Sequence, residues 1–236
     1  MISQEGNLSI LIAAYNEESN IGKTIAETRN AFSCAEIVVV DDGSKDQTFS
    51  EAKKFENNFV KVVSIFHCGK GGAIRRAIAE ASRDIMFQVD ADLQFPLEGI
   101  LTLIRPILEG KADIVFGSRY LDPSGIEKKS VSFSKRMSSY IVGIIISIIC
   151  GQRYTDVFGG LKAWKADVIK DINIQENSFA YEAEIAIKAK RYGYTVIEVP
   201  TAYKRRVGGK SKIRFLYHIF EIPWRIMHIA ACSRKK

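Results

Sequence analysis

Apolar, strand-like segments alternate with helix-like segments through the first half of the chain, and this alternation limits the fold more than any other feature. The strand-like segments are rich in β-branched residues and apolar on both faces; they lie at residues 8–15, 36–40, 60–66, 85–89 and 113–116. The stretches between them have helical spacing, as at residues 17–32. Strands without polar alternation are buried on both faces, as in parallel sheets. The sequence therefore predicts an α/β fold, a mostly parallel sheet with helices on both faces.

The second half predicts two long apolar helices, at about 130–150 and 213–231. The first follows a group of basic residues, and the second is rich in aromatic residues and is expected to be interrupted by Pro223. No apolar stretch reaches the roughly 18 residues of a membrane-spanning helix. Amphipathic segments of this kind can lie at a lipid surface without crossing it. We expect both to be membrane-facing, interfacial helices, with a core helix as the alternative for the first.

The remaining elements complete a single domain. Residues 155–164 are expected to return to the sheet, residues 179–192 to form a helix and residues 195–203 to form a last strand. The sequence has no internal repeat, low-complexity tract or linker. One catalytic domain spanning residues 1–236 is therefore predicted.

The chain carries an excess of positive charge, with 34 Lys and Arg against 27 Asp and Glu, or +7. Such an excess favours anionic partners: nucleic acid, phosphorylated small molecules or lipid headgroups. The four cysteines lie far apart, without the close pairs of a zinc site or a disulfide framework. The amino terminus lacks a basic segment followed by a long apolar run, so no secretory signal is expected. We therefore expect a reducing, cytoplasmic location; together with the two predicted interfacial helices, this suggests a peripheral protein on the cytoplasmic face of a membrane.

Polar clusters follow four of the predicted strands. They are Asn16-Glu17, Asp41-Asp42, Asp90-Ala91-Asp92 and Ser118-Arg119. In open α/β sheets, ligands bind beyond the carboxyl ends of the strands. The clusters therefore predict one site along one edge of the sheet.

The pair Asp90 and Asp92 is the strongest of these signals. Two carboxylates two residues apart, on a chain leaving a strand, can converge on one divalent cation. Hard oxygen ligands select Mg²⁺ or Mn²⁺, which can bridge and neutralise a diphosphate. Gln94 would add a neutral oxygen ligand. Taken alone the pair also suits a solvated turn, but its place at a strand end favours the metal site.

Three weaker signals each leave an alternative open. Asp42 can accept hydrogen bonds from a ribose or a base, while Ser44 or Asp46 can cap the helix that follows. The glycine-rich segment at residues 69–72 can present backbone N–H groups to an anion or can simply form a tight turn. The basic run at residues 204–214 suits a flap over a bound diphosphate or a solvated charged face.

Several motifs in order carry a resemblance to a known family. The segments are Ala13-Ala14-Tyr15-Asn16-Glu17, Val39-Val40-Asp41-Asp42-Gly43-Ser44, Asp90-Ala91-Asp92-Leu93-Gln94 and Gly117-Ser118-Arg119-Tyr120. Together they resemble glycosyltransferase family 2, which has the Rossmann-like GT-A fold. Downstream, residues 156–162 and 206–212 look like the branch of dolichyl- or polyprenyl-phosphate mannose and glucose synthases. The resemblance covers residues 8–212.

This resemblance implies a role for each matching position. The nucleoside would be held by Ala13, Tyr15, Glu17, Val40 and Asp42, and the metal and diphosphate by Asp90, Ala91, Asp92 and Gln94. Catalytic roles would fall to Asp92 and to the phosphate-binding Arg119, Arg206 and Lys212; Asp156, Lys162 and Glu184 would complete the substrate site. Glu184 would orient the flap arginines, with a helix-face ion pair as the alternative. Family members usually have Pro at the position of Ala13 and Phe at that of Leu161.

The expected reaction is an inverting transfer of a sugar from a nucleotide-diphosphate donor to a polyprenyl or dolichyl phosphate at the membrane surface. GDP-mannose and UDP-glucose both suit as donor, and a UDP-N-acetylhexosamine is a further alternative. Residues 156–162 resemble the glucose-type pattern slightly more, through Lys162. A phosphate monoester is already ionised near neutral pH, so the acceptor needs no general base of the kind that a hydroxyl needs.

Other function classes fit the sequence less well. The nearest rival is a family 2 transferase that acts on a saccharide hydroxyl in glycan or polysaccharide synthesis. A nucleic-acid-binding domain would suit the positive charge, but carboxylates at the site would repel a phosphate backbone, so we expect no nucleic acid partner. A Rossmann dehydrogenase would need a glycine fingerprint after the first strand, which is missing.

Overall fold

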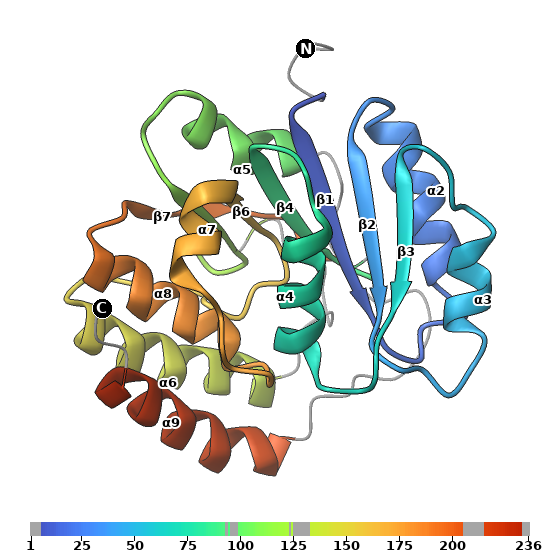
Figure 1. The fold of residues 1–236 in the computed structure, drawn as a ribbon. Helices are drawn as coiled ribbons and strands as arrows, with labels where there is room; N and C mark the ends of the chain where they lie inside the picture. The colour runs from blue at the N-terminus through green and yellow to red at the C-terminus, as the bar shows by residue number, and fades with distance from the viewer. Residues whose placement is uncertain are drawn as a thin grey trace.

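The computed structural model describes residues 6–92, 94, 99–122, 124, 133–204 and 215–232, which include a seven-stranded sheet (Figure 1). The strand order is β3-β2-β1-β4-β6-β5-β7. The strands are β1 Leu8–Ala14, β2 Glu36–Asp41, β3 Val60–Ser64, β4 Ile85–Asp90, β5 Ile114–Ser118, β6 Lys162–Lys165 and β7 Val196–Pro200. All neighbours pair in parallel except β6, which is antiparallel to both β4 and β5. The predicted mostly parallel sheet is confirmed.

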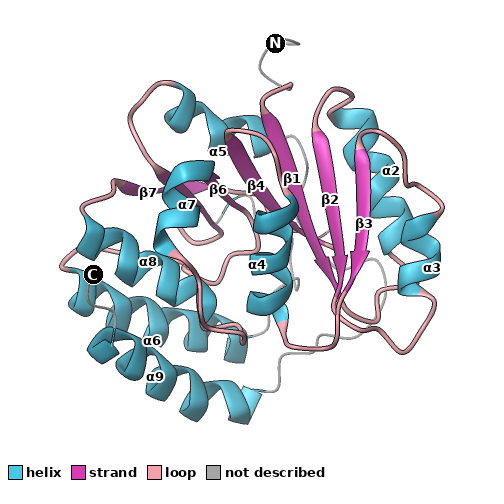
Figure 2. Ribbon diagram, viewed as in Figure 1, coloured by secondary structure: helices cyan, strands magenta, loops and turns pink. Residues whose placement is uncertain are grey.

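Helices cover both faces of this sheet (Figure 2). One face packs against α2 Ile21–Ala31, α3 Thr48–Lys53 and α5 Gly99–Leu108. The other face packs against α4 Lys70–Glu80, α7 Ala166–Ile172 and α8 Tyr181–Tyr192, with α6 Phe133–Cys150 and α9 Phe215–Cys232 completing that layer. In Figure 1, α6 and α9 lie side by side at the end toward which β1, β2 and β3 run.

The strands are buried on both faces because their side chains point alternately into two cores. Ile10 and Ile12 of β1 belong to the core beneath α2 and α5, whereas Leu11 belongs to the core beneath α4 and α8. Val38 and Val39 of β2 alternate in the same way. A strand with apolar residues at every position therefore has no solvent face to fill with polar ones.

Two helices differ from the sequence prediction. The structure continues α9 through Pro223, where an interruption was expected. Proline removes one backbone hydrogen bond, but Ile222, Ile226 and Ile229 are buried on the same side of α9, so packing outweighs that loss. The second difference is α7, a helix of seven residues that the sequence did not predict. Within the described part of the chain, no helix has the length and apolar character needed to cross a bilayer.

Candidate active site

The polar clusters after the strands come together at one edge of the sheet. Ala13 of β1 lies opposite Asp90 of β4 and next to Val40 of β2. Beyond β4, Ser118 ends β5 at the same edge. Because β6 is antiparallel, its first residue, Lys162, is the one that reaches this edge.

The loops after β1 and β2 are bonded to each other. Asn16, which has a φ of +50°, donates its backbone N–H to Ser44 Oγ over 2.8 Å. In return, Asn16 Oδ1 accepts the backbone N–H of Lys45 over 2.8 Å. Tyr15 and Glu17, which are predicted to hold a nucleoside, therefore flank a braced turn.

The side chains of Val40 and Ala91 are buried in the core, so these two predicted ligand contacts have only their backbone to offer. Ala13 is half-buried between them.

Asp42 holds the loop that follows β3. Its carboxylate is buried and accepts the backbone N–H groups of Cys68 over 2.9 Å and Gly69 over 3.0 Å. The Nδ1 atom of His67 lies 2.9 Å from Asp42 Oδ2, and the His67 ring stacks on Tyr15 with centroids 4.2 Å apart. Asp42 thus supports a half-exposed aromatic pair at the end where the nucleoside is predicted. The capping role weighed for this segment belongs to Asp46, whose Oδ1 accepts the backbone N–H of Thr48 at the start of α3.

Replacing Asp42 with Ala is expected to loosen this loop. Hydrogen bonds to a charged group contribute about 1.5–3 kcal/mol, so we expect the free energy of unfolding to fall by about that amount. Nucleotide affinity should fall at least about tenfold, because the Tyr15–His67 pair loses its support. Urea denaturation and calorimetric titration with UDP and GDP measure the two effects. Asp167→Ala, an exposed position on α7, is the matched control; unchanged nucleotide binding in Asp42→Ala would contradict this role.

The carboxylates at the end of β4 lie in different surroundings. Asp90 Oδ1 lies 2.8 Å from the ammonium of Lys70 at the start of α4. Burial acts to raise the pKa of Asp90, but Lys70, Lys162 and Arg119 together outweigh burial and hold the pKa below its usual value. Asp92 is buried, and its Oδ1 accepts the backbone N–H of Gln94 over 3.3 Å. The turn between the two carboxylates is fixed by Thr24, whose hydroxyl donates to the Ala91 carbonyl over 2.9 Å.

Gln94 joins this turn to the segment after β7. The backbone N–H of Lys204 donates to the Gln94 carbonyl over 2.7 Å, and Gln94 Nε2 donates to the Lys204 carbonyl over 3.3 Å. Lys204 is the first residue of the basic run, so this pairing places that one residue at the acidic end of β4. Arg206 and Lys212, predicted to bind phosphate, lie outside the described residues.

The oxygen atoms at the end of β4 suit a hard divalent cation that takes its remaining ligands from another molecule. Mg²⁺ and Mn²⁺ take about six oxygen ligands. Within the described ranges, no three His, Cys, Asp or Glu side chains gather closely enough to hold a metal. Asp90, Asp92 and Gln94 supply oxygens of the right kind but too few, and the Lys70 ammonium already marks a place where a cation is held. The residues therefore fit a metal that a diphosphate helps to bind.

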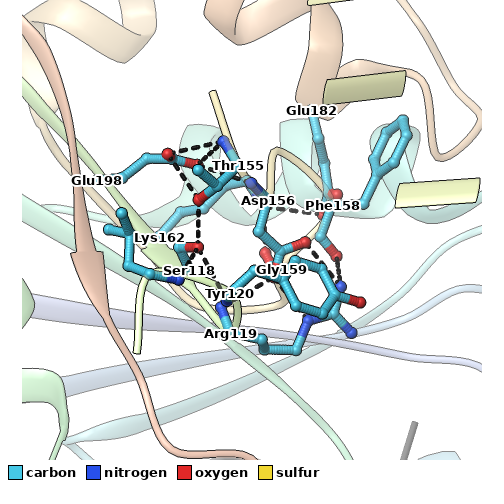
Figure 3. Close-up of polar contacts among 11 residues, drawn as sticks. Ser118, Arg119, Tyr120, Thr155, Asp156, Phe158, Gly159, Lys162, Glu182 and Glu198 are labelled. Carbon is cyan, nitrogen blue, oxygen red and sulfur yellow. Dashed lines mark hydrogen bonds and ion pairs between the residues drawn. The ribbon is translucent and has the colours of Figure 1, made fainter. Parts of the chain in front are cut away.

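Arg119 and Asp156 form a buried, bidentate ion pair (Figure 3). Arg119 Nε lies 2.6 Å from Asp156 Oδ2 and Nη2 lies 2.8 Å from Oδ1, while the Arg119 backbone N–H also donates to Oδ2 over 3.0 Å. The guanidinium lies over the rings of Tyr120 and Tyr203, 5.4 and 5.1 Å from their centroids. Burial acts to lower the pKa of Arg119, but Asp156, Tyr120 and Tyr203 together outweigh burial and raise it. The sequence predicts that Arg119 binds phosphate; the structure shows two of its nitrogens already engaged by Asp156.

Glu198 of β7 holds the segment that carries Asp156. The sequence analysis did not single out this residue. Its carboxylate accepts the backbone N–H of Asp156 over 2.8 Å and both the backbone N–H and the hydroxyl of Thr155 (Figure 3). Thr155 Oγ1 in turn lies 2.6 Å from Ser118 Oγ at the end of β5. The segment carrying Asp156 is therefore fixed to two strands.

A second buried ion cluster lies next to Asp90. Glu182 Oε1 lies 3.1 Å from the ammonium of Lys162 and 3.4 Å from that of Lys70, and it accepts the Tyr181 hydroxyl over 3.0 Å. Lys162 is fully buried and also contacts the Gly159 carbonyl, and burial lowers its pKa. Lys162, predicted to contact substrate, instead lies beneath the edge within protein contacts.

The glycine-rich segment before α4 packs tightly against the loop before α8. The N–H of Gly69 donates to Asp42, and that of Gly71 donates to the Asn177 carbonyl over 2.8 Å. A Cβ on Gly71 would lie 2.2 Å from the Glu176 carbonyl oxygen. These contacts favour the tight turn over the anion cradle.

Glu184, on α8, holds the same loop. Its carboxylate accepts the backbone N–H groups of Gln175 and Glu176 and lies 2.6 Å from the Lys188 ammonium. The i,i+4 ion pair weighed as its alternative role is present. Its predicted link to the flap arginines lies outside the described residues.

Comparison with known proteins identifies the family. The profile of glycosyl transferase family 2 matches residues 9–172. Dolichol-phosphate mannosyltransferase of Pyrococcus furiosus is 32% identical over 229 residues, which cover 91% of this chain and 63% of that protein. A UDP-N-acetylglucosamine–dolichyl-phosphate N-acetylglucosaminyltransferase of Methanococcus voltae is 31% identical, covering 87% of this chain and 91% of that protein. Undecaprenyl-phosphate mannosyltransferase of Micrococcus luteus is 28% identical, with 86% of each chain covered.

Solved structures share the fold. The crystal structure of glucosyl-3-phosphoglycerate synthase from Mycobacterium tuberculosis, in complex with Mn²⁺, UDP and phosphoglyceric acid, superposes with a TM-score of 0.76. It covers 100% of this chain and 84% of that chain at 17% identity, so the likeness shows the GT-A fold alone. Because the family profile matches most of the chain, the chain belongs to glycosyl transferase family 2 and is a glycosyltransferase of GT-A fold.

Proposed function

We propose that this chain transfers a sugar from a nucleoside-diphosphate donor to a polyprenyl phosphate at a membrane surface, with inversion at the sugar carbon. The Tyr15–His67 end of the sheet edge would hold the nucleoside, and the end of β4 the diphosphate. Asp90, Asp92 and Gln94 would hold Mg²⁺ or Mn²⁺, which when bound would neutralise charge on the departing nucleoside diphosphate. The Pyrococcus, Methanococcus and Micrococcus relatives are all named for transfer to a polyprenyl or dolichyl phosphate.

One observation carries the choice of a lipid acceptor. A groove of about 770 Å³ lies against α6. Its lining includes Tyr120 and Thr155, the chain neighbours of Arg119 and Asp156, together with the basic Arg136 and Arg153 and the apolar Tyr140, Ile144 and Ile148. The Tyr120 ring both lines the groove and contacts Arg119. The groove therefore offers basic side chains to an anionic head and apolar side chains to a hydrocarbon chain.

The acceptor chemistry suits the residues present. An ionised phosphate oxygen would attack the sugar carbon from the side opposite the diphosphate, forming the new C–O bond as the old one breaks. It needs no base to remove a proton. The side chains' tasks are then to hold the two anions in line and to neutralise their charge.

The same layer offers a face for the membrane. On α6, Met137, Tyr140, Ile141, Ile144 and Ile148 are exposed although they are apolar, with Ile148 77% exposed. On the neighbouring α9, Trp224 is 73% and Met227 57% exposed. Exposed apolar side chains on adjacent helices, with basic side chains in the groove beside them, are typical of a peripheral membrane surface. These two helices are the ones that the sequence predicts to lie at a membrane surface.

Replacing Ile148 with Glu is expected to weaken binding to lipid vesicles at least about tenfold. The variant loses apolar area that would be buried in the membrane and adds a charge there. The side chain is exposed, so the melting temperature should hardly change. Cosedimentation with vesicles of phosphatidylcholine and phosphatidylserine measures the effect. Leu108→Glu on α5, on the other face of the sheet and 41% exposed, is the matched control. Equal loss in both variants, or none in Ile148→Glu, would contradict the membrane face.

The proposed function is tested by incubating the protein with Mn²⁺ or Mg²⁺, GDP-mannose, UDP-glucose or UDP-N-acetylglucosamine, and a short-chain polyprenyl phosphate. We expect one donor to give a glycolipid that is extracted into organic solvent. Sugar transfer to a soluble saccharide, with none to the lipid phosphate, would instead favour a family 2 transferase that acts on hydroxyl groups. Absence of a lipid product with every donor would contradict the proposal.

A further inference from the structure

The ammonium of Lys70 lies where a divalent cation would approach Asp90. Lys70 Nζ is 2.8 Å from Asp90 Oδ1 and 3.4 Å from Glu182 Oε1, and its side chain is only 18% exposed. Two carboxylates therefore hold the Lys70 ammonium at the acidic end of β4.

The backbone holds Lys70 in this place. Gly69, directly before it, has a φ of +100°, and a Cβ there would lie 2.5 Å from the Asn177 carbonyl oxygen. Gly71, directly after it, is bonded to the same carbonyl. The start of α4 is therefore clamped to the loop before α8. The Lys70 ammonium also lies 5.7 Å from the centroid of the Phe179 ring.

The four charged groups that ion pairs join around Lys70 balance one another. Lys70 and Lys162 face Asp90 and Glu182, two positive groups against two negative ones. The neighbouring Arg119 is matched by Asp156. A divalent cation brought to Asp90 would add positive charge a few ångströms from Lys70, and like charges at that separation repel strongly in a partly buried site. The negative charge of a nucleoside diphosphate would remove this penalty.

We propose that Lys70 acts as an internal counter-ion that keeps a divalent cation off Asp90 until a nucleoside diphosphate arrives, so that metal and donor bind together. This rests on the proposed metal-dependent function. Lys70 is then a positioning residue that acts through Asp90. Because binding linkage is reciprocal, the metal and the nucleotide should raise each other's affinity by the same factor, and that factor should shrink when the charge of Lys70 is removed.

The proposal is tested by measuring free Mn²⁺ by electron paramagnetic resonance as each protein is titrated with Mn²⁺ alone. Lys70→Met keeps side-chain length and removes the charge; we expect it to bind Mn²⁺ at least about tenfold more tightly than the unsubstituted protein. Lys70→Arg keeps the charge and should stay weak. Lys61→Met is the matched control: it removes a half-exposed lysine of β3 that pairs with Glu80 at the far end of α4. Its Mn²⁺ affinity should be unchanged.

Repeating the titration with UDP or GDP completes the cycle. In the unsubstituted protein one nucleotide should tighten Mn²⁺ binding at least about tenfold, and in Lys70→Met this gain should be smaller. Unfolding would only weaken metal binding, so tighter binding in Lys70→Met supports the proposal directly. If that variant does not melt cooperatively, the unsubstituted protein decides: equal Mn²⁺ affinity with and without a nucleotide that binds would overturn the proposal.

The outcomes separate this inference from the proposed function. If a nucleotide binds with Mn²⁺ but folded Lys70→Met binds Mn²⁺ alone no more tightly than the unsubstituted protein, the role of Lys70 is wrong and the function stands. If neither UDP nor GDP binds with any metal, the proposed function fails. The metal-alone comparison then still decides whether Lys70 excludes a cation from Asp90.

Discussion

Asp92→Asn is expected to reduce sugar transfer by about 10²–10³-fold while leaving the fold intact. Asp92 is buried at the end of β4 on a turn held by Thr24 and Gln94, and the amide has the same shape as the carboxylate. Losing one charge from the donor set would leave the charge of the departing diphosphate poorly compensated, an electrostatic loss of the size seen when one group that stabilises a transition state is removed.

The measurement is kcat/KM with the donor that gives a lipid product, together with Mn²⁺ affinity in the presence of its nucleoside diphosphate. Asp122→Asn is the matched control, because Asp122 is exposed and, among the described residues, its carboxylate bonds only to Ser124. We expect an unchanged melting temperature in both variants and lost activity in one. An Asp92→Asn enzyme with more than a tenth of the original kcat/KM would rule out Asp92 as a metal ligand.

Asp156→Ala is expected to have the largest effect on stability. It leaves the buried guanidinium of Arg119 without its bidentate partner and removes the acceptor of the Arg119 backbone N–H. Removing one member of a buried ion pair costs about 3–5 kcal/mol because the other charge stays buried and uncompensated. Activity should fall as well, since Arg119 lies between the end of β5 and the groove along α6.

A double-mutant cycle separates the two consequences. Adding Arg119→Met to Asp156→Ala removes the stranded charge, so urea denaturation should recover a large part of the lost free energy of unfolding. Sugar transfer should not recover, because the cation itself would be missing. Asp156→Ala alone with a loss below about 1 kcal/mol, or a double variant no more stable than it, would contradict the structural role of this pair.

The strands and their common edge could be predicted from the sequence because the signals are local. Residues 36–40 and 85–89 are apolar at nearly every position, and acidic residues follow each at once. The continuity of α9 through Pro223 could not be predicted, because burial of Ile226 and its neighbours is a tertiary effect. The same holds for β6, whose reversed direction depends on its pairing with β4 and β5.

The candidate site shows the same division. Asp90 and Asp92 were recognisable as a motif, whereas their surroundings depend on residues far away in sequence. Lys70 meets Glu182 112 positions away, and Arg119 meets Asp156 37 positions away. No spacing rule links such residues, so the sequence could suggest Arg119 and Lys162 as ligand contacts but not the ion pairs that each forms with Asp156 and Glu182. Glu198 carried no local signal at all.

The most direct test of the account is a crystal structure of the protein grown with Mn²⁺ and the nucleoside diphosphate that binds it, with an anomalous-difference map collected at the manganese edge. We predict a manganese peak at the end of β4, about 2.1–2.5 Å from an Asp92 oxygen and from diphosphate oxygens, with the base beside Tyr15 and His67. A nucleotide bound away from this edge, or a peak that no carboxylate of β4 contacts, would contradict the account.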